Sequence, residues 1–448
     1  MHSAWRRPVP SLLLLALAFP WASVAHAGND DEILNGPEAA MTGGAVTAVT
    51  AETASLIYNP AGVAGIEHSR VEASASAFAL RYYSAALIRN AAGDRANGTF
   101  LEIVSAPSAL GFVTPLGGHF YLGLGAFVTR ASNVNINAYL AEDVGTAANP
   151  SLEAKWLLTI ADQTTLYHFG GALGFRAAPN LRLGVGLLGL YAGTFGSYQL
   201  AGGLREGDTD SVGNFVVAAG RLSADYFGLR ANAGVQYDAT PNLALGLSVM
   251  SPGFILLSSG ELASAEAGTD FSTVALFDAS RDKETRFGFD ALEPLRVRAG
   301  AALKWDGHWV ALDADIQPGI SDKTLGTERE FVWNARLGGK FHVAEEFWLG
   351  GGLFTDLASE PTVRGLGEAR LDYLGGTLGA AWSNARKLDP SEGNADIAFS
   401  TTLSLRYAYG FGQVGGLLTN SSMLVDDTYP VDVTAHEFAL YFGSGLHY

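Results

Sequence analysis

Regular alternation of apolar and polar residues, repeated along most of the chain, limits the fold more than any other feature. In residues 229–238 every second residue is apolar, and the residues between are arginine, asparagine, glycine, glutamine and aspartate. Residues 295–304, 330–341 and 403–411 repeat the pattern. Successive side chains of a β-strand point to opposite faces, so each segment predicts a strand with one apolar and one polar face.

The connections between these segments alternate in length. After the second, fourth, sixth and eighth segments they are tight turns such as Asp306-Gly307, a dipeptide typical of two-residue hairpins. After the third, fifth and seventh they are long, at residues 130–163, 193–225 and 250–292. The fourteen predicted strands begin near Arg70, Leu101, His119, Thr164, Leu181, Tyr226, Leu243, Glu293, His308, Glu330, Phe347, Arg370, Ala395 and Asp432.

This sorting of short and long connections favours a membrane barrel over a soluble sandwich. A sandwich also alternates, but it has no reason to place its short turns at one end. Outer-membrane barrels have short periplasmic turns and long outer loops. We therefore expect an all-β fold: a 14-stranded antiparallel transmembrane β-barrel in the cell outer membrane, with both termini periplasmic.

The C-terminal segment favours the same assignment. Its apolar residues share one parity and the chain ends on an aromatic residue, which resembles the assembly signal of outer-membrane barrels; an ordinary terminal strand would also alternate. These residues are Phe438, Leu440, Phe442, Leu446 and Tyr448.

The first 27 residues have the organisation of a secretory signal peptide. Two arginines precede an apolar run at residues 12–19, and Ala25-His26-Ala27 is a small-residue cleavage site. A membrane anchor is the alternative, but Pro20 ends the run well short of the roughly 20 residues that a spanning helix needs. We therefore expect a signal peptide at residues 1–27 and export in a Gram-negative cell.

Composition excludes several classes of function. The chain has no cysteine, so it has no disulfide, thiolate metal site or cysteine nucleophile. Its formal net charge of −17 makes nucleic acid an unsuitable partner. The nine histidines lack the spacing of metal ligands, and we expect neither a metal nor a cofactor.

Residues 28–68, between the predicted signal peptide and the first strand, do not alternate. They are rich in small residues, including Gly43-Gly44-Ala45, and they contain Asn59-Pro60-Ala61-Gly62. Asn-Pro followed by glycine is a common turn signal. Small residues and turns also suit a segment packed inside a narrow lumen. The predicted domains after the signal peptide are thus an N-terminal hatch at 28–68 and a barrel at 69–448.

The segment around this motif resembles the N-terminal hatch of the FadL-type outer-membrane transporters of long-chain fatty acids and hydrocarbons. The resemblance rests on residues 56–62, and it extends to residues 107–116, 121–125, 183–192 and 232–241. After the seventh predicted strand the chain departs from the family, because Val249-Met250-Ser251 replaces the usual Tyr-Arg-Ser run. The outer loops do not align with the family.

The resemblance implies a passive transporter whose barrel is plugged by its N-terminal segment. Hydrophobic ligands such as long-chain fatty acids or hydrocarbons would be captured by the extracellular loops, pass the hatch and leave sideways into the lipid. Asn59, Pro60, Ala61 and Gly62 would be the hatch and gating residues. The implied partners are this ligand, outer-membrane lipid and the barrel assembly machinery, and we expect a monomer.

The longest predicted loop, residues 250–292, contains two apolar runs. Exposed apolar residues beyond the membrane favour a ligand-capture groove, although the loop could also bury them among themselves. The candidate ligand-binding residues are Phe254, Ile255, Leu256, Leu257, Val274, Leu276 and Phe277.

Charged residues of both signs occupy the polar parity of the predicted strands. Mixed signs in a narrow lumen favour a paired network that holds a plug, with an ion-conducting eyelet as the alternative. The residues of this predicted network are Arg230, Arg296, Arg298, Asp313, Asp315, Arg336 and Arg406.

Two other functions stay open: a solute-specific porin, which would lack the plug, and an outer-membrane acyl hydrolase. A hydrolase needs a serine beside a histidine such as His119 or His168, and the chain has no Gly-x-Ser-x-Gly elbow. Residues 184–189 match a dinucleotide fingerprint, but they lie within a predicted strand rather than between a strand and a helix. We therefore expect no enzyme activity.

Overall fold

The structure is a computed structural model. It describes residue 29 and residues 33–90, 95–143, 152–206, 212–269, 275–322, 327–363, 368–387, 396–419 and 425–448. The predicted signal peptide and Val274 lie outside these described residues. No helix among them is long and apolar enough to cross a membrane.

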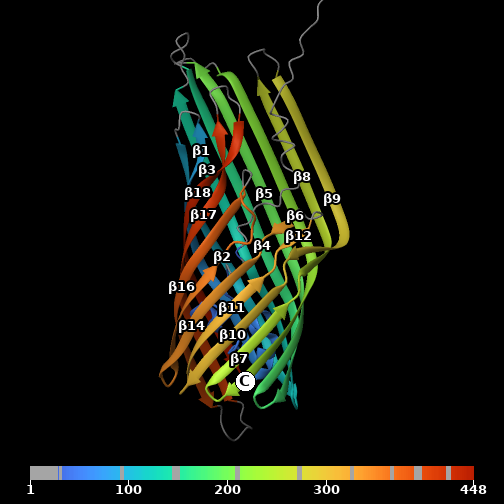
Figure 1. Cartoon of the computed structure of the whole chain (residues 1–448), viewed down its shortest axis with the longest axis vertical. Helices are drawn as coiled ribbons and strands as arrows, with labels where there is room; N and C mark the ends of the chain where they lie inside the picture. Colours follow the sequence, from blue (N-terminus) through green and yellow to red (C-terminus); the bar gives the residue numbers. More distant parts are fainter. Residues whose placement is uncertain are drawn as a thin grey trace, which may run out of the picture.

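One sheet closes on itself and forms a tall barrel (Figure 1). Its strands and a separate two-stranded sheet, β12–β13, are β1 (Arg70–Asn90), β2 (Arg95–Gly117), β3 (Phe120–Asp143), β4 (Leu152–Ala178), β5 (Leu181–Glu206), β6 (Val212–Thr240), β7 (Leu243–Met250), β8 (Gly253–Thr269), β9 (Ala275–Glu293), β10 (Arg296–Trp305), β11 (His308–Gln317), β12 (Ile320–Asp322), β13 (Thr327–Arg329), β14 (Val332–Ala344), β15 (Phe347–Asp356), β16 (Ala369–Lys387), β17 (Asp396–Thr419) and β18 (Val425–His447).

Closure joins the first strand, β1, to the last strand, β18. Hydrogen bonding follows the chain from β1 to β7, continues through β10, β11 and β14 to β18, and returns to β1. In this last pairing Arg70 lies opposite His447 in an antiparallel register. We call the end of the barrel that carries the C terminus in Figure 1 the lower end. It also carries the tight turns, such as Asp306-Gly307, where both residues have positive φ angles.

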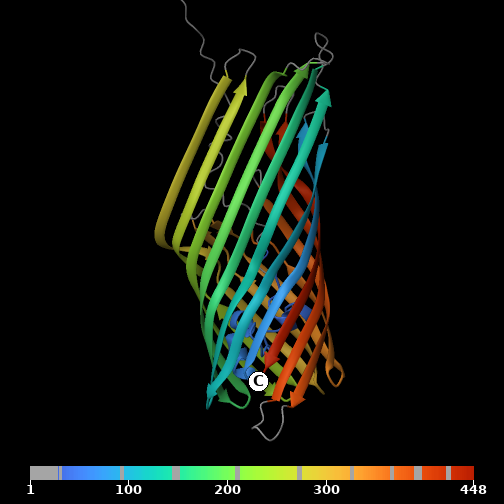
Figure 2. The ribbon, with the colours of Figure 1, turned by 180° about the vertical axis from the view of Figure 1, so that it is seen from behind.

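Two strands, β8 and β9, form a hairpin that departs from the ring. β7 pairs with the lower part of β6, and β8 pairs with β6 above it, from Leu229 to Val216. Within the described residues β9 pairs with β8 and ends the bonding order of the sheet. Pro252 and Pro294 separate the hairpin from β7 and β10, because proline has no N–H to donate to a ladder. In both views the hairpin continues the sheet beside β6, and its lower end projects sideways from the barrel (Figure 2).

Two expectations from the sequence are therefore wrong. Among the described residues the main sheet contains sixteen strands rather than fourteen. The long connections are largely strand rather than loop, since β4 begins at Leu152 instead of near Thr164, and β6 begins at Val212 instead of near Tyr226. In the hairpin, residues 256–268 are all partly exposed, so no apolar face marks them as a strand.

The apolar side chains lie on the outer face of the wall in its lower part and on the inner face in its upper part. In the lower part of β4, Tyr167 and Phe169 are exposed outside while His168 is buried inside. In its upper part, Trp156 and Leu158 are buried inside, and the outer face includes Glu153. The lower wall thus presents the apolar exterior that a bilayer requires, whereas the upper wall has the buried apolar interior of a water-soluble barrel. Because of this reversal of parity, an apolar outer face does not identify the upper parts of the strands in the sequence.

The N-terminal segment, residues 33–68, lies inside the lower part of the barrel (Figure 2, blue). It contains the short helices α2 (Pro37–Met41) and α3 (Ser55–Tyr58) and the 3-10 helix η1 (Pro60–Gly65). Strands β3 to β6 contact η1, and β15 to β18 contact α2. The segment therefore touches opposite sides of the ring.

Glycines on the inner face allow this segment to approach the wall backbone to backbone. A Cβ atom on Gly184 would overlap the backbone of Pro60, and one on Gly338 would overlap the carbonyl group of Thr42. Close approach of two backbones is a common reason for glycine within a strand. This close approach explains why glycine occupies so many of the strand positions that alternate with apolar residues.

The substitution Gly184→Ala should loosen the N-terminal segment. The new methyl group must displace Pro60, and overpacking of this kind costs about 1–3 kcal/mol. Limited proteolysis and thermal unfolding of the purified protein would measure the effect. Gly193→Ala on the same strand is a matched control, because its Cβ would meet other atoms only at 3.6 Å or more. Equal behaviour of the two variants would contradict the prediction.

Candidate functional site

Asn59, in the predicted hatch motif, ties the N-terminal segment to itself and to the wall. Its amide Nδ2 donates to the carbonyl oxygens of Thr47 at 2.8 Å and of Val235 in β6 at 3.0 Å. Its Oδ1 accepts from the backbone nitrogen of Ala61 at 3.2 Å and so caps η1. Pro60 follows at the start of this helix, where a missing N–H breaks no helical hydrogen bond. The motif is therefore a helix start that also bonds to the barrel.

The other two residues of the motif are small because the segment folds tightly on itself. Ala61 is completely buried, and Gly62 is buried as well. A Cβ on Gly62 would overlap the carbonyl oxygen of Thr50. Both positions therefore exclude larger side chains.

Polar side chains of the wall bond to the backbone of the N-terminal segment from several directions. Such bonds satisfy carbonyl groups that would otherwise be buried without a partner. Four of them run from Asn232 to Leu56, from Arg298 to Ile57 at 3.0 Å, from Thr377 to Met41 at 2.8 Å and from Ser404 to Ala40 at 2.6 Å.

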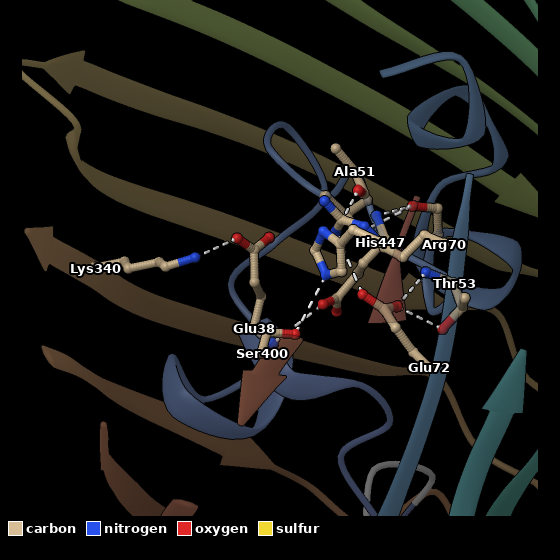
Figure 3. Close-up of polar contacts among 11 residues, drawn as sticks. Glu38, Ala51, Thr53, Arg70, Glu72, Lys340, Ser400 and His447 are labelled. Atoms are coloured by element: carbon tan, nitrogen blue, oxygen red, sulfur yellow. Dashed lines mark hydrogen bonds and ion pairs between the residues drawn. The ribbon is translucent and has the colours of Figure 1, made fainter. Parts of the chain in front are cut away.

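Carboxylates form a second set of contacts at the lower end (Figure 3). Glu72 of β1 accepts hydrogen bonds from the backbone nitrogen and the hydroxyl of Thr53, both at 2.8 Å. Glu38 of α2 lies 2.8 Å from the ammonium group of Lys340 on β14. The segment is thus held to β1 by a carboxylate of the wall and to β14 by a carboxylate of its own.

Glu52 is buried in the segment close to these carboxylates. One of its oxygens accepts from the backbone nitrogen of Glu38 at 3.3 Å. Burial, and then the charges of Glu72 and Glu38, raise the pKa of Glu52 well above its ordinary value. A raised pKa means that the folded segment binds this proton more tightly than the unfolded chain does. Ionised Glu52 therefore destabilises the seated segment, and the loss grows as pH rises from the ordinary carboxyl range toward the folded pKa.

The substitution Glu52→Gln should stabilise the seated segment at neutral pH, because the glutamine carries no charge and keeps an acceptor for the Glu38 amide. Resistance to proteolysis, measured between about pH 5 and pH 8, should depend less on pH in the variant than in the parent protein. Glu153→Gln, at an exposed position on β4, is the control. An undiminished pH dependence in the Glu52 variant would refute this role.

Asp315 of β11 lies at the centre of the predicted charge network. Its carboxylate is 3.2 Å from Arg298 and 3.5 Å from Arg336, and it also contacts Arg296. These side chains are at most 9% exposed, so each charge depends on its partners. Asp313, on the same face of β11, accepts instead from the backbone nitrogen of Thr47 at 2.8 Å.

The remaining predicted charges belong to two separate groups. Arg230 contacts Glu293, whose carboxylate is 3.3 Å from His168. Arg406 contacts Glu437, which lies 2.9 Å from Arg81. These groups also contain Glu293, Glu437, Arg81 and Glu102, which were not predicted from the sequence. Parity would have found three of them, since Arg81, Glu102 and Glu437 alternate with exposed apolar neighbours such as Leu80, Leu101 and Phe438.

A small cavity of about 40 Å³ lies between the N-terminal segment and the wall. Arg130, Arg230, Arg296 and Arg298 line it together with Glu293. This volume holds a water molecule or two and no larger solute. A bulky ligand could reach these arginines only if the N-terminal segment moved.

The interior above the charged level is apolar. Residues from β1 to β6 and from β15 to β18 form one buried cluster, which includes Leu87, Ile136, Trp156, Leu200 and Leu417. An apolar solute that moves from water into such surroundings gains about 25 cal/mol per Å² of buried surface. From top to bottom, the interior is therefore apolar, then charged, and then filled by the N-terminal segment.

The candidate ligand-binding residues that the structure describes lie at opposite ends of the β8–β9 hairpin. Phe254, Ile255, Leu256 and Leu257 lie at the lower end of β8, where Ile255 packs inward and Phe254 is exposed. Leu276 and Phe277 lie in β9 at the opposite end of the hairpin. Their expected placement on a loop is wrong, because the region is a paired hairpin. Ligand binding by these residues stays a prediction.

The histidines considered for a hydrolase have other neighbours. His168 faces inward, with its Nδ1 3.1 Å from the hydroxyl of Thr129. His119 is exposed, and its ring packs edge-on against Phe175. A serine does lie beside His447, with the Ser400 hydroxyl at 3.2 Å, among the contacts of the lower end (Figure 3).

The wall contains a break in backbone pairing, which we call the β2–β3 seam: residues 95–108 of β2 and 128–143 of β3. Between these two strands the register described runs only from Gly117–Phe120 up to Ala109–Phe127. β3 nevertheless stays paired with β4 up to Asp143. Pro107, which cannot donate to a ladder, lies in β2 next to the point where the pairing ends.

No protein-family model and no curated protein matches the sequence. Solved structures do match the fold. A Pseudomonas aeruginosa FadL homologue is similar with a TM-score of 0.61 and 12% identity over 94% of this chain and 99% of that one. The P. putida toluene transporter TodX gives 0.56 and 12% over 92% and 98%. The monoaromatic hydrocarbon channel CymD gives 0.54 and 13% over 95% and 99%.

These likenesses cover almost the whole length of each protein at a low sequence identity, so what they establish is the architecture. The resemblance inferred from the hatch motif is confirmed at this level. The chain has the fold of the FadL homologues and of the TodX and CymD hydrocarbon channels.

Proposed function

We propose that this protein is a passive outer-membrane transporter of hydrophobic small molecules such as long-chain fatty acids or hydrocarbons. The observation that carries the proposal is the reversal of the wall, which has an apolar exterior below and an apolar interior above. A hydrophobic solute gains nothing from a water-filled pore, but it can partition into an apolar interior. The similarity to proteins described as a toluene transporter and a monoaromatic hydrocarbon channel supports the same function.

The proposed orientation places the lower end in the periplasm. Outer-membrane barrels carry their short turns on that side, and the tight turns of this barrel lie at its lower end. The tall strands and the β8–β9 hairpin would then project outside the cell, and both termini would be periplasmic. The barrel assembly machinery would insert the protein, which we propose acts as a monomer.

The N-terminal segment is proposed to act as a hatch. A ligand that descends from the upper interior meets the ionic groups and then residues 33–68, which leave room for little more than water. Asn59, Pro60, Ala61 and Gly62 would seat the hatch, and the charge network around Asp315 would hold it in place. The ligand would leave sideways through the lower part of the β2–β3 seam, because backbone pairing is interrupted there and Leu101 and Ile103 still give the wall an apolar exterior at that level.

Uptake measurements test this function directly. Expression of the protein in a strain without its own transporter should restore uptake of radiolabelled oleate, hexadecane or toluene. An inactive barrel of similar size in the same strain is the control. Failure with all three compounds would count against the transporter, and a steady ion conductance in planar bilayers would favour the porin alternative.

A disulfide can test whether the hatch must move. A Cβ on Gly350 would lie 3.0 Å from the Cβ of Met41, slightly closer than the usual 3.5–4.5 Å of a disulfide. The chain has no other cysteine, so Met41→Cys with Gly350→Cys would give one defined crosslink. Uptake should stop in the oxidised protein and return after reduction.

The single variant Gly350→Cys serves as the control for this experiment and should not respond to oxidation. Full uptake through the crosslinked protein would show that residues near Met41 do not have to move.

A further inference from the structure

Side chains take the place of the missing ladder at the β2–β3 seam. Arg81 donates from Nη1 to the carbonyl oxygen of Ala131 at 3.3 Å. The backbone nitrogen of Asn133 donates to a carboxylate oxygen of Glu102. Both Ala131 and Asn133 belong to the part of β3 that β2 does not pair in the described register. Polar backbone groups buried in a protein need partners, and here two charged side chains supply them.

Arg81 and Glu102 also belong to a buried row of ion pairs that runs along the inner face of the wall from β2 to β17. Arg81 lies 3.4 Å from Glu102 and 2.9 Å from Glu437 of β18, and Glu437 contacts Arg406 of β17. The side chains of all four residues are at most 4% exposed. Buried charges of this kind are stable only as a paired group. Glu437 and Arg406 lie on the side of β1 that is away from β3. Their ion pairs therefore hold Arg81 and Glu102 in position against β3.

The N-terminal segment contributes to the same edge. The amide Nδ2 of Asn35 donates to the carbonyl oxygen of Val128 at 3.2 Å. Val128 lies at a register shift between β3 and β4. Movement of the segment would withdraw this bond from β3 directly below the positions that Arg81 and Glu102 hold.

Separation of two fully paired strands breaks a series of backbone hydrogen bonds that form cooperatively along their length. A side chain can instead release its partner by rotation about its own bonds. The seam can thus open with a smaller change in backbone pairing than a fully paired joint would need. Neighbouring joints, such as β3–β4, are paired along their whole length apart from single register shifts.

We propose that Arg81 and Glu102 form a latch that keeps the β2–β3 seam closed and that releases when a hydrophobic molecule leaves the barrel. The proposal rests on the proposed transport function. Asn35 links the latch to the hatch, since both hold the same strand edge. Opening of the hatch therefore lowers the number of bonds that keep the seam closed.

Hydrogen exchange tests the latch without any transport. In the full-length protein in lipid nanodiscs, Glu102→Ala should speed exchange in the β3 segment around Asn133 by about tenfold, the loss expected for one charge-assisted hydrogen bond. Glu102→Gln keeps an acceptor and should stay within about threefold of the parent protein. Glu153→Ala, which removes an exposed carboxylate of β4 that pairs with Lys155, is the control.

Oleate uptake by the same variants tests the role of the latch. Faster exchange together with faster uptake in Glu102→Ala, and neither in Glu153→Ala, is the expected result. Unchanged exchange in Glu102→Ala would overturn the latch, and faster exchange with unchanged uptake would overturn its gating role. If the parent protein takes up no hydrophobic compound, the proposed transport fails, while the exchange result alone still decides whether Glu102 holds the seam.

Discussion

The backbone hydrogen-bond ladder is the interaction on which the rest of this structure depends. Within a bilayer no water replaces a missing partner, so a sheet must close on itself. The pairing of β1, the first strand, with β18, the last, achieves this. The ladder also determines where side chains must take over: at the β2–β3 seam, arginine, glutamate and asparagine side chains bond to the edge of β3.

The N-terminal segment depends on this wall in a second way. Its helices are only four to six residues long and cannot be stable alone. They persist because glycines bring the wall close to them and because wall side chains bond to their carbonyl groups. The same contacts bury several charges, and each of these requires its partners in place. Movement of the segment therefore changes the electrostatics of the whole lower interior.

The sequence predicts the lower wall well because one face of each strand there is apolar. Strands β11 and β15 begin at His308 and Phe347, as expected from alternation. Prediction fails where the apolar parity moves to the inner face, as it does at Trp156, and in the hairpin, where both faces are exposed. A single rule about apolar faces cannot cover a barrel that passes from lipid into water.

The site was predictable only in part for a related reason. Parity identifies the inward arginines Arg230, Arg298 and Arg336, but their partners depend on how far each strand is shifted against the next. That shift is set by closure of the ring and not by any one strand. The seat of the hatch is equally hidden, because it consists largely of contacts between two backbones. Local sequence describes side chains and says little about such contacts.

Within the described residues no further strand pairs with the outer edge of β9, and this edge affects how these molecules behave side by side. An unpaired strand edge can join the edge of a second molecule and start aggregation. Arg281, Asp282, Lys283 and Glu284 are all exposed along this edge. If two molecules paired through this edge, these charged side chains would lie beside the same charged side chains of the second molecule. In most registers of the two strands, like charges would repel. The hairpin can therefore project beyond the membrane without drawing neighbouring molecules into a shared sheet.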